Sequence, residues 1–167
     1  MKVLAAEIRI ERMKEEHLIL IKDFQSSERE LVTFLQGDAI HNQQRRISVT
    51  YIWFFEEKLV GYLTLLNDRI HLEGDLKKHF QDNGIHYNSL PALKIGRLCV
   101  DERYTRRGIG TLMIAFAVEK ADKIFLEIAG CKFITLEAKR DSLQFYQMCG
   151  FASLRHAKHY IQLYLTV

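Results

Sequence analysis

The sequence predicts an α+β fold with a mixed, mostly antiparallel sheet that contains one parallel β-α-β step. A stretch rich in β-branched and aromatic residues, Ser48–Leu66, is interrupted only by Glu56, Glu57 and Lys58, which predicts a hairpin that we expect at the centre of the sheet. Further along, a long amphipathic helix connects the apolar runs Ala92–Val100 and Lys132–Ala138. A strand, crossover helix and strand of this length form a parallel pair.

The segment before the hairpin predicts one strand and two helices. Polar and apolar residues alternate over Glu7–Met13, which predicts a first strand, and Glu15–Phe24 is typical of a short helix. Ser26 and Ser27 precede two glutamates, which is a capping signal, and apolar residues then recur at helical spacing as far as His41. We therefore expect one continuous helix from these serines to His41.

Beyond the hairpin, the polar segment Glu73–Asn88 predicts a short helix near Asp75–Gln81, in an excursion over an active site. The helix that starts at Ile109 carries a predicted buried stripe of Ile109, Leu112, Met113, Phe116, Ala117, Ile124 and Ile128. Asp141 is expected to cap a short helix that stops at Cys149 and Gly150. The alternating residues 159–167 predict a last strand.

The bulk composition indicates one globular domain over residues 1–167. With 48% hydrophobic and 27% charged residues, no membrane-length apolar run and no signal peptide, we expect a cytoplasmic protein without membrane contact. Cys99, Cys131 and Cys149 lack paired spacing and are expected to be reduced core thiols. No Cys or His set has metal-ligand spacing, so no metal is predicted.

The segment Val100–Thr111, VDERYTRRGIGT, predicts a phosphate site at a strand-to-helix junction. The first amides of a helix lack intrahelical partners, so those of Gly108, Ile109, Gly110 and Thr111 are available to an anion. Glycine permits close approach to the backbone, and the neighbouring Arg106 and Arg107 add positive charge. A dinucleotide fingerprint would need a third glycine, and a P-loop would need a lysine before the hydroxyl residue, so both of those classes are excluded.

At this point the chain resembles the GNAT superfamily of acyl-CoA-dependent N-acetyltransferases. The resemblance rests on GRLCVDERYTRRGIG, the long helix after it, and the later FYQMCGF, which occur in the family's order and at its separation. Two positions depart from the family pattern. Thr105 stands where the family has Gln or Arg, and Lys139 stands where many relatives have Asn.

The resemblance implies a three-layer α/β/α fold, with six to seven strands splayed at the parallel pair and helices on both faces. It also implies acetyl-CoA as the cosubstrate, wedged between the splayed strands. Backbone groups of Leu98, Cys99 and Val100 would pair with the pantetheine, and one of these amides would serve as the oxyanion donor. The residues of the glycine loop, Arg106, Arg107, Gly108, Ile109, Gly110 and Thr111, would hold the pyrophosphate.

Tyr146 is the predicted general acid, because a phenol is protonated at neutral pH and can donate a proton to the departing thiolate. The alternative is that Tyr146 only packs with Phe145 and Phe151. Glu137 is a candidate general base, and His86 and Tyr87 are alternative candidates. A further alternative is that the reaction needs no general base. Arg97 is expected to form an ion pair with Glu137 or Asp101 or to bind substrate.

The predicted reaction is acetyl transfer to a primary amine by direct attack in a ternary complex. The segments SERELVTFLQGDAI, TYIWFF, VGYLTLL and ALKIGRLCVDERY resemble the GNAT branch that includes toxins acetylating the α-amine of aminoacyl-tRNA. The net charge of +3, Arg45, Arg46 and the basic cluster Arg155–His159 suit such a partner, although that cluster is also typical of a solvated hairpin. Alternative acceptors are a small amine, an antibiotic or a protein amine, and a further alternative is a regulatory acyl-CoA-binding module without turnover. A homodimer is expected by analogy.

Overall fold

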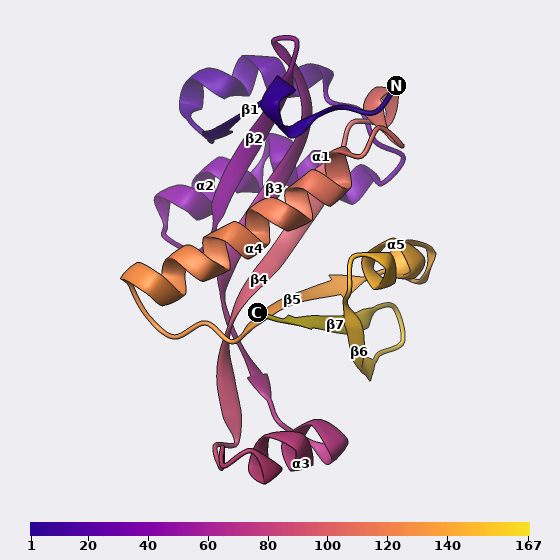
Figure 1. The fold of residues 1–167 in the computed structure, drawn as a ribbon. Helices are drawn as coiled ribbons and strands as arrows, with labels where there is room; N and C mark the ends of the chain where they lie inside the picture. Colours follow the sequence, from indigo (N-terminus) through magenta and orange to yellow (C-terminus); the bar gives the residue numbers. More distant parts are fainter. The chain divides into compact units, whose positions relative to one another are not determined.

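The computed structural model describes residues 1–167 and holds a mixed seven-stranded sheet (Figure 1). The hydrogen-bonded strands follow the order β1-β2-β3-β4-β5-β7-β6, with one parallel pair, β4 and β5, in a mostly antiparallel sheet. The strands are β1 Ile8–Arg12, β2 Val49–Phe55, β3 Lys58–His71, β4 Ser89–Val100, β5 Phe133–Ala138, β6 Ala152–His156 and β7 Ile161–Thr166. The predicted α+β class and parallel step are confirmed. The centre of the order is β4, so the hairpin β2-β3 lies to one side of it, contrary to expectation.

Helices and short 3₁₀ segments connect these strands. The α-helices are α1 Arg29–Gln36, α2 Asp38–Gln44, α3 Gly74–Asp82, α4 Ile109–Glu127 and α5 Leu143–Met148. The 3₁₀ segments are η1 Ala5–Glu7, η2 Glu15–Asp23, η3 Glu102–Tyr104 and η4 Arg140–Ser142. None of the helices has the length and apolar character that crossing a bilayer requires.

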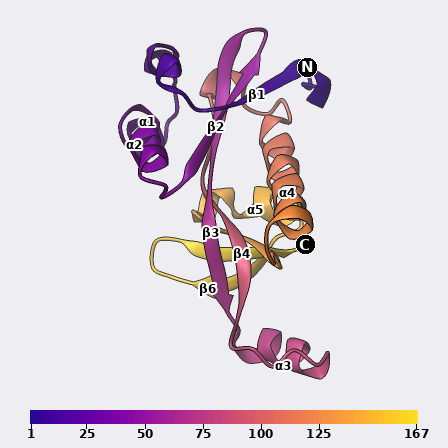
Figure 2. The ribbon, with the colours of Figure 1, turned by 90° about the vertical axis from the view of Figure 1, so that its left-hand side faces the viewer.

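The chain divides into two compact units, of which unit 1 comprises residues 1–66 and 95–116. In unit 1, α1 and α2 lie on one side of β2 and the beginning of α4 lies on the other (Figure 2). Ile52 and Phe54 belong to the core on the α1–α2 side, whereas Trp53 and Phe55 belong to the core with Ile109 of α4. Because alternate strand residues point to opposite faces, this unbroken apolar run is buried on both sides.

Gly61 in β3 marks a close approach of α4 to the sheet within unit 1. A Cβ added at Gly61 would lie 2.4 Å from Cε of Met113 and 2.8 Å from the carbonyl oxygen of Cys99. The end of the Met113 side chain could move aside, but the backbone carbonyl of Cys99 could not, so the close approach of β4 requires glycine at this position. Without a side chain at Gly61, Met113 of α4 also packs directly on β3.

Unit 2 comprises residues 67–94 and 117–167 and has its own core around Phe133 of β5. The Phe133 ring meets Phe80 of α3 and Tyr164 of β7 edge-on, with centroids 5.6 and 5.8 Å apart. Strand β7 lies where the sequence predicts a last strand, and it pairs antiparallel with β5 on one side and with β6 on the other. The short helix α5 ends at Met148 with Cys149 as its C-cap, and Gly150 follows with φ of +93°, so the predicted stop at Cys149 and Gly150 is confirmed.

The predicted continuous helix from Ser26 to His41 is wrong. The structure has two helices, because α1 closes at Gly37, whose N–H donates to the Thr33 carbonyl over 3.0 Å, and α2 begins at Asp38. Glycine weakens the middle of a helix, and the break allows both helices to bury their apolar sides against the sheet. Ser26 does not cap α1: its hydroxyl accepts from the N–H of Glu28, the residue before the helix.

The short helix predicted at Glu15–Phe24 is present, as a 3₁₀ helix over Glu15–Asp23. Two smaller expectations differ from the structure. The buried stripe of α4 continues through Ala121, whereas Ile128, beyond the helix end, is 75% exposed. Asp141 lies inside η4, and Ser142 precedes α5. Each error lies at an element's end, where tertiary packing rather than the local pattern decides the boundary.

Candidate functional site

The glycine loop, defined as residues 105–111, runs from the end of η3 into the first turn of α4 and has the backbone expected of an anion site. Gly108 has φ of +84° and Arg106 has φ of +59°, both in the left-handed region. The helix begins at Ile109, and Leu112 is the residue whose N–H bonds back to the Gly108 carbonyl, over 3.2 Å. The amides of Ile109, Gly110 and Thr111 therefore have no intrahelical acceptor.

The strand that leads into this loop, β4, ends at Val100, and the next residue, Asp101, is completely buried. Its carboxylate accepts hydrogen bonds from the amides of Gln25 and Arg103, each over 3.0 Å, and from two nitrogens of the Arg103 guanidinium, each over 2.8 Å. Burial alone would raise the pKa of Asp101, but the donors from Arg103 and the backbone lower it below its ordinary value. The carboxylate thus fixes the end of β4 to the segment before α1. Sequence reasoning considered Asp101 only as a partner of Arg97 and missed this role.

Some side chains of the glycine loop make contacts within the protein, and others are exposed to solvent. Arg107 lies over the Tyr104 ring, with the guanidinium carbon 5.1 Å from the centroid, whereas Arg106 is exposed. The Thr105 hydroxyl donates to the carbonyl of Glu102 over 3.1 Å. At the position where the sequence departs from the family pattern, the side chain therefore stabilises the loop's own turn.

The last residues of β4 point alternately into the two cores of unit 1. Leu98 and Val100 pack against the core around Ile109, whereas Cys99 is buried on the α1–α2 side. Burial raises the pKa of Cys99 to about 11, so this thiol remains protonated at neutral pH, as a core thiol does. The pKa values of Cys131 and Cys149, which are partly buried, are raised by burial as well.

Arg97 in β4 does not form the ion pair that the sequence predicts. Its guanidinium carbon lies 5.0 Å from the centroid of the Phe34 ring in α1, and Nη1 donates to the carbonyl of Gly96 over 2.7 Å. The two expected partners are engaged elsewhere, because Asp101 binds Arg103 and Glu137 binds Lys94. The side chain of Arg97 remains exposed.

In unit 2, Tyr146 is held by aromatic neighbours on α5 and just beyond it. Its ring meets Phe145 and Phe151 edge-on, with centroid distances of 5.0 and 5.8 Å. The N–H of Phe151 donates to the Tyr146 carbonyl over 3.1 Å, which ties the turn after the helix to the tyrosine. The Tyr146 ring is therefore oriented by packing and is itself only half-buried.

Glu137 lies near the end of β5 in unit 2. Its carboxylate accepts from the Lys94 ammonium over 2.9 Å, and its side chain is 42% exposed. Two residues earlier on the same face of β5, the buried Thr135 hydroxyl donates to Asp68 over 2.6 Å. Both polar pairs therefore line one face of this part of the sheet.

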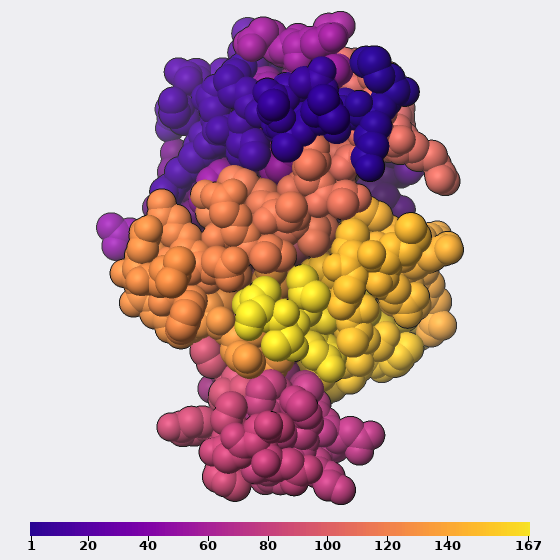
Figure 3. Space-filling view, viewed as in Figure 1, coloured from indigo at the N-terminus to yellow at the C-terminus, as the bar shows by residue number.

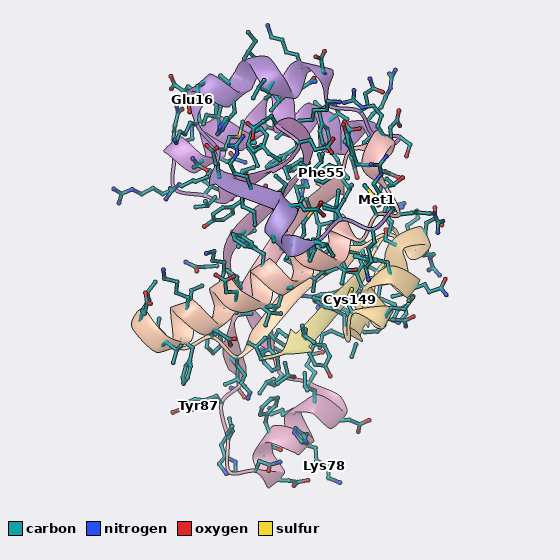
Figure 4. The ribbon with its side chains drawn as sticks, turned by 45° about the horizontal axis from the view of Figure 1, so that its top comes forward. Met1, Glu16, Phe55, Lys78, Tyr87 and Cys149 are labelled. Atoms are coloured by element: carbon teal, nitrogen blue, oxygen red, sulfur yellow. The ribbon has the colours of Figure 1, made fainter.

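The alternative base candidates lie in the segment between α3 and β4. His86 is exposed, and Tyr87 is 71% exposed, with its side chain extending away from the ribbon (Figure 4). The basic cluster Arg155–His159 lies in the β6-β7 hairpin, and Arg155 binds Glu73 over 3.2 Å.

A cluster of potential ligand atoms that the sequence did not reveal lies in unit 1. Atoms of Glu11, Glu16 and His17 lie within 4.8 Å of one another, contributed by β1 and η2. His17 Nδ1 accepts from the Lys14 amide over 3.0 Å, and Nε2 lies 3.3 Å from the Glu11 carboxylate. Burial lowers the pKa of His17, so its neutral ring satisfies both contacts and the cluster is explained without an ion.

Comparisons with known proteins agree with this geometry. Residues 14–151 match the Acetyltransferase (GNAT) family. A search of curated proteins returned no match. The chain is similar to the solved structure of AtaT complexed with acetyl-methionyl-tRNAfMet, with a TM-score of 0.80 and 22% identity over 95% of this chain and 94% of that one. It is also similar to a mutant of KacT, with a TM-score of 0.82 and 22% identity over 96% and 95% of the two chains. A third similar structure is AtaTR bound with AcCoA, with a TM-score of 0.78, 22% identity and coverage of 96% and 94%.

Proposed function

Because the chain belongs to the GNAT acetyltransferase family, we propose that it transfers an acetyl group from acetyl-CoA to a primary amine by direct attack in a ternary complex. The observation that carries this proposal is the glycine loop, with Gly108 at φ of +84° and a helix start whose amides lack partners. This backbone suits a pyrophosphate, because the amides and the helix dipole both favour negative charge.

The residues of unit 1 fit the cosubstrate, which supplies the acetyl group through its thioester. The Ile109, Gly110 and Thr111 amides bind the pyrophosphate in this proposal, and Arg106 and Arg107 contribute charge to the same loop. Backbone groups of Leu98–Val100 pair with the pantetheine, and one amide of this strand donates to the carbonyl oxygen as charge develops on it.

Tyr146 is the proposed proton donor. When the amine nitrogen bonds to the acetyl carbon, the carbon–sulfur bond breaks and the thiolate requires a proton. The Tyr146 phenol supplies it, and the edge-on contacts with Phe145 and Phe151 limit the directions in which the ring can point. The packing role and the donor role of this residue are therefore compatible.

Glu137 is the proposed acceptor of the proton that the amine loses. Its carboxylate is accessible from solvent and has the Lys94 ammonium as its ion-pair partner. A water molecule can relay the proton where the amine is out of reach of the side chain.

We propose the α-amine of aminoacyl-tRNA as the acceptor. The support for this is that AtaT, one of the similar structures, is complexed with acetyl-methionyl-tRNAfMet, and that this chain has a net charge of +3. The electron-withdrawing ester lowers the pKa of such an amine, so the reaction requires little help from a base. A small amine or a protein amine is the competing acceptor, and a non-catalytic acyl-CoA-binding module is the competing function.

The test is to mix the purified protein with acetyl-CoA and one acceptor pool at a time, and to measure the free thiol released. The pools are charged tRNA, charged tRNA whose α-amine is already blocked, and free amines with peptides. We expect release only with the first pool, and a rate that falls as salt rises, because phosphate contacts are screened. Release with free amines alone would overturn the proposed acceptor. Tight binding of acetyl-CoA without turnover on any pool would overturn the proposed catalysis.

A further inference from the structure

The segment that precedes β1 is fastened to the glycine loop. The N–H of Val3 donates to the carbonyl of Arg107 over 2.9 Å, and the Val3 side chain, 3% exposed, packs in the core with Ile109 and Met113. In Figures 1 and 3 these first residues, in indigo, lie against the salmon segment that leads into α4. Val3 thus anchors its neighbours in the chain beside the proposed phosphate site.

Lys2 lies directly over Gly108. Its Cε, Cγ and Cδ atoms lie 3.2, 3.3 and 3.9 Å from the position that a Cβ at Gly108 would occupy. The aliphatic part of the side chain therefore covers the glycine, and the ammonium group, one bond beyond Cε, lies next to the loop. Lys2 is exposed, so this group is accessible to a ligand from solvent.

The positive charge of Lys2 adds to the phosphate-binding groups of the glycine loop. The guanidinium of Arg107 lies on Tyr104, and one of its nitrogens is 3.5 Å from the Arg103 carbonyl, so this arginine is partly engaged within the protein. A lysine ammonium is a compact point charge that binds phosphate oxygens readily. Together with the amides of the helix start, it surrounds a phosphate with donors from two distant parts of the sequence.

We propose that Lys2 binds a phosphate group of acyl-CoA. This inference rests on the proposed function, since it assigns a further ligand to the same cosubstrate site. A lysine that served only to cover Gly108 would need its aliphatic stem but no charge. Lys2→Met keeps a stem of similar length and removes the ammonium, and Lys2→Arg keeps the charge, so the two variants separate packing from phosphate binding.

The experiment measures the Kd of acetyl-CoA, dephospho-acetyl-CoA and acetyl-pantetheine by calorimetry at low and high salt. We expect Lys2→Met to weaken acetyl-CoA binding about tenfold, since a charge-assisted contact to phosphate is lost. Lys2→Arg should retain most of the affinity. Lys22→Met, which removes an exposed charge elsewhere in unit 1, serves as the matched control and should leave the Kd unchanged.

The outcomes assign the contact and test it. A tenfold loss that persists with dephospho-acetyl-CoA places Lys2 on the pyrophosphate, and a loss that disappears places it on the 3′-phosphate. In steady-state assays the KM for acetyl-CoA should rise while kcat stays constant. An unchanged Kd in Lys2→Met, an equal loss with acetyl-pantetheine, or a rise in the KM for the acceptor alone would overturn the proposal. If the unaltered protein bound no acetyl-CoA, the proposed function itself would fail.

Discussion

The ends of strands β4 and β5 each carry a carboxylate, and the two are held in opposite ways. Asp101 at the end of β4 is wholly buried and accepts four hydrogen bonds from Gln25 and Arg103. Glu137 near the end of β5 has a side chain that is 42% exposed and one ion-pair partner, Lys94. A buried carboxylate cannot lose its partners without leaving an uncompensated charge, whereas an exposed one is readily resolvated.

This difference supports a structural role for Asp101 and the proposed chemical role for Glu137. Asp101 fixes the backbone at the start of the segment that leads to the glycine loop, and a carboxylate with so many donors is a poor proton acceptor. The exposed Glu137 pair is expected to contribute little to stability, which leaves its carboxylate accessible for the proposed proton transfer. From the sequence, Glu137 is a candidate base and Asp101 only a possible partner of Arg97, and the difference in their burial is not visible there.

The largest expected effect concerns the loop that follows β4. Gly108→Val should weaken acetyl-CoA binding by more than about 100-fold, because a β-branched residue is strained at φ of +84° and displaces Lys2 from the loop. Gly84→Val is the matched control, since Gly84 has φ of +80° with open space around it. The control should retain acetyl-CoA affinity in calorimetry. An unaltered affinity in Gly108→Val would refute the cosubstrate site.

The next effect concerns the segment that follows β5. Tyr146→Phe should lower kcat about 100-fold, the usual contribution of a general acid, and change the Kd of acetyl-CoA less than about twofold. The ring contacts with Phe145 and Phe151 do not depend on the hydroxyl, so we expect them to persist in the variant. Tyr160→Phe, at an exposed tyrosine, provides the control. Single-turnover rates equal to those of the unaltered protein would leave Tyr146 with a packing role only.

The smallest effects test the two carboxylates directly. Asp101→Asn should lower the free energy of unfolding by about 2 kcal/mol, because hydrogen bonds to a charged group are lost. Glu137→Gln should lower it by less than about 0.5 kcal/mol, as expected for an exposed pair, but lower kcat about tenfold. Urea unfolding and steady-state kinetics measure both quantities. A larger loss of stability in Glu137→Gln would reverse the assignment of roles.

The same pair of variants predicts a dependence on pH. The pKa of Asp101 in the folded protein lies below its ordinary value of 3.8, so its contribution to stability is fully present above about pH 3.8. It is lost as the pH falls through the lower, folded value. The difference in the free energy of unfolding between the unaltered protein and Asp101→Asn should therefore shrink in strong acid. Glu137→Gln, whose expected difference is small, serves as the reference variant in the same urea unfolding series.

Local patterns predicted most of the strands and the loop that carries the proposed chemistry. The β-branched and aromatic residues of Val49–Phe55 and the glycines at the start of α4 are local features of the sequence, and the structure has the strand and the helix start where they were expected. The break at Gly37 was missed because packing of two helices against one sheet face outweighs helical periodicity. Arg97 was assigned a carboxylate partner, but both carboxylates have nearer cations.

The sequence by itself determined the α+β class, the parallel step and the Gly108 helix start, because each depends on residues close together in the chain. Only the tertiary structure decided which groups meet: the Asp101 carboxylate with the Gln25 amide, the Lys94 ammonium with Glu137, and the Lys2 side chain with Gly108. These contacts join residues separated by dozens of positions, and local propensity carries no information about such pairs. Burial and distance, which arise only on folding, distinguish the carboxylate that supports the loop from the one that is accessible for proton transfer.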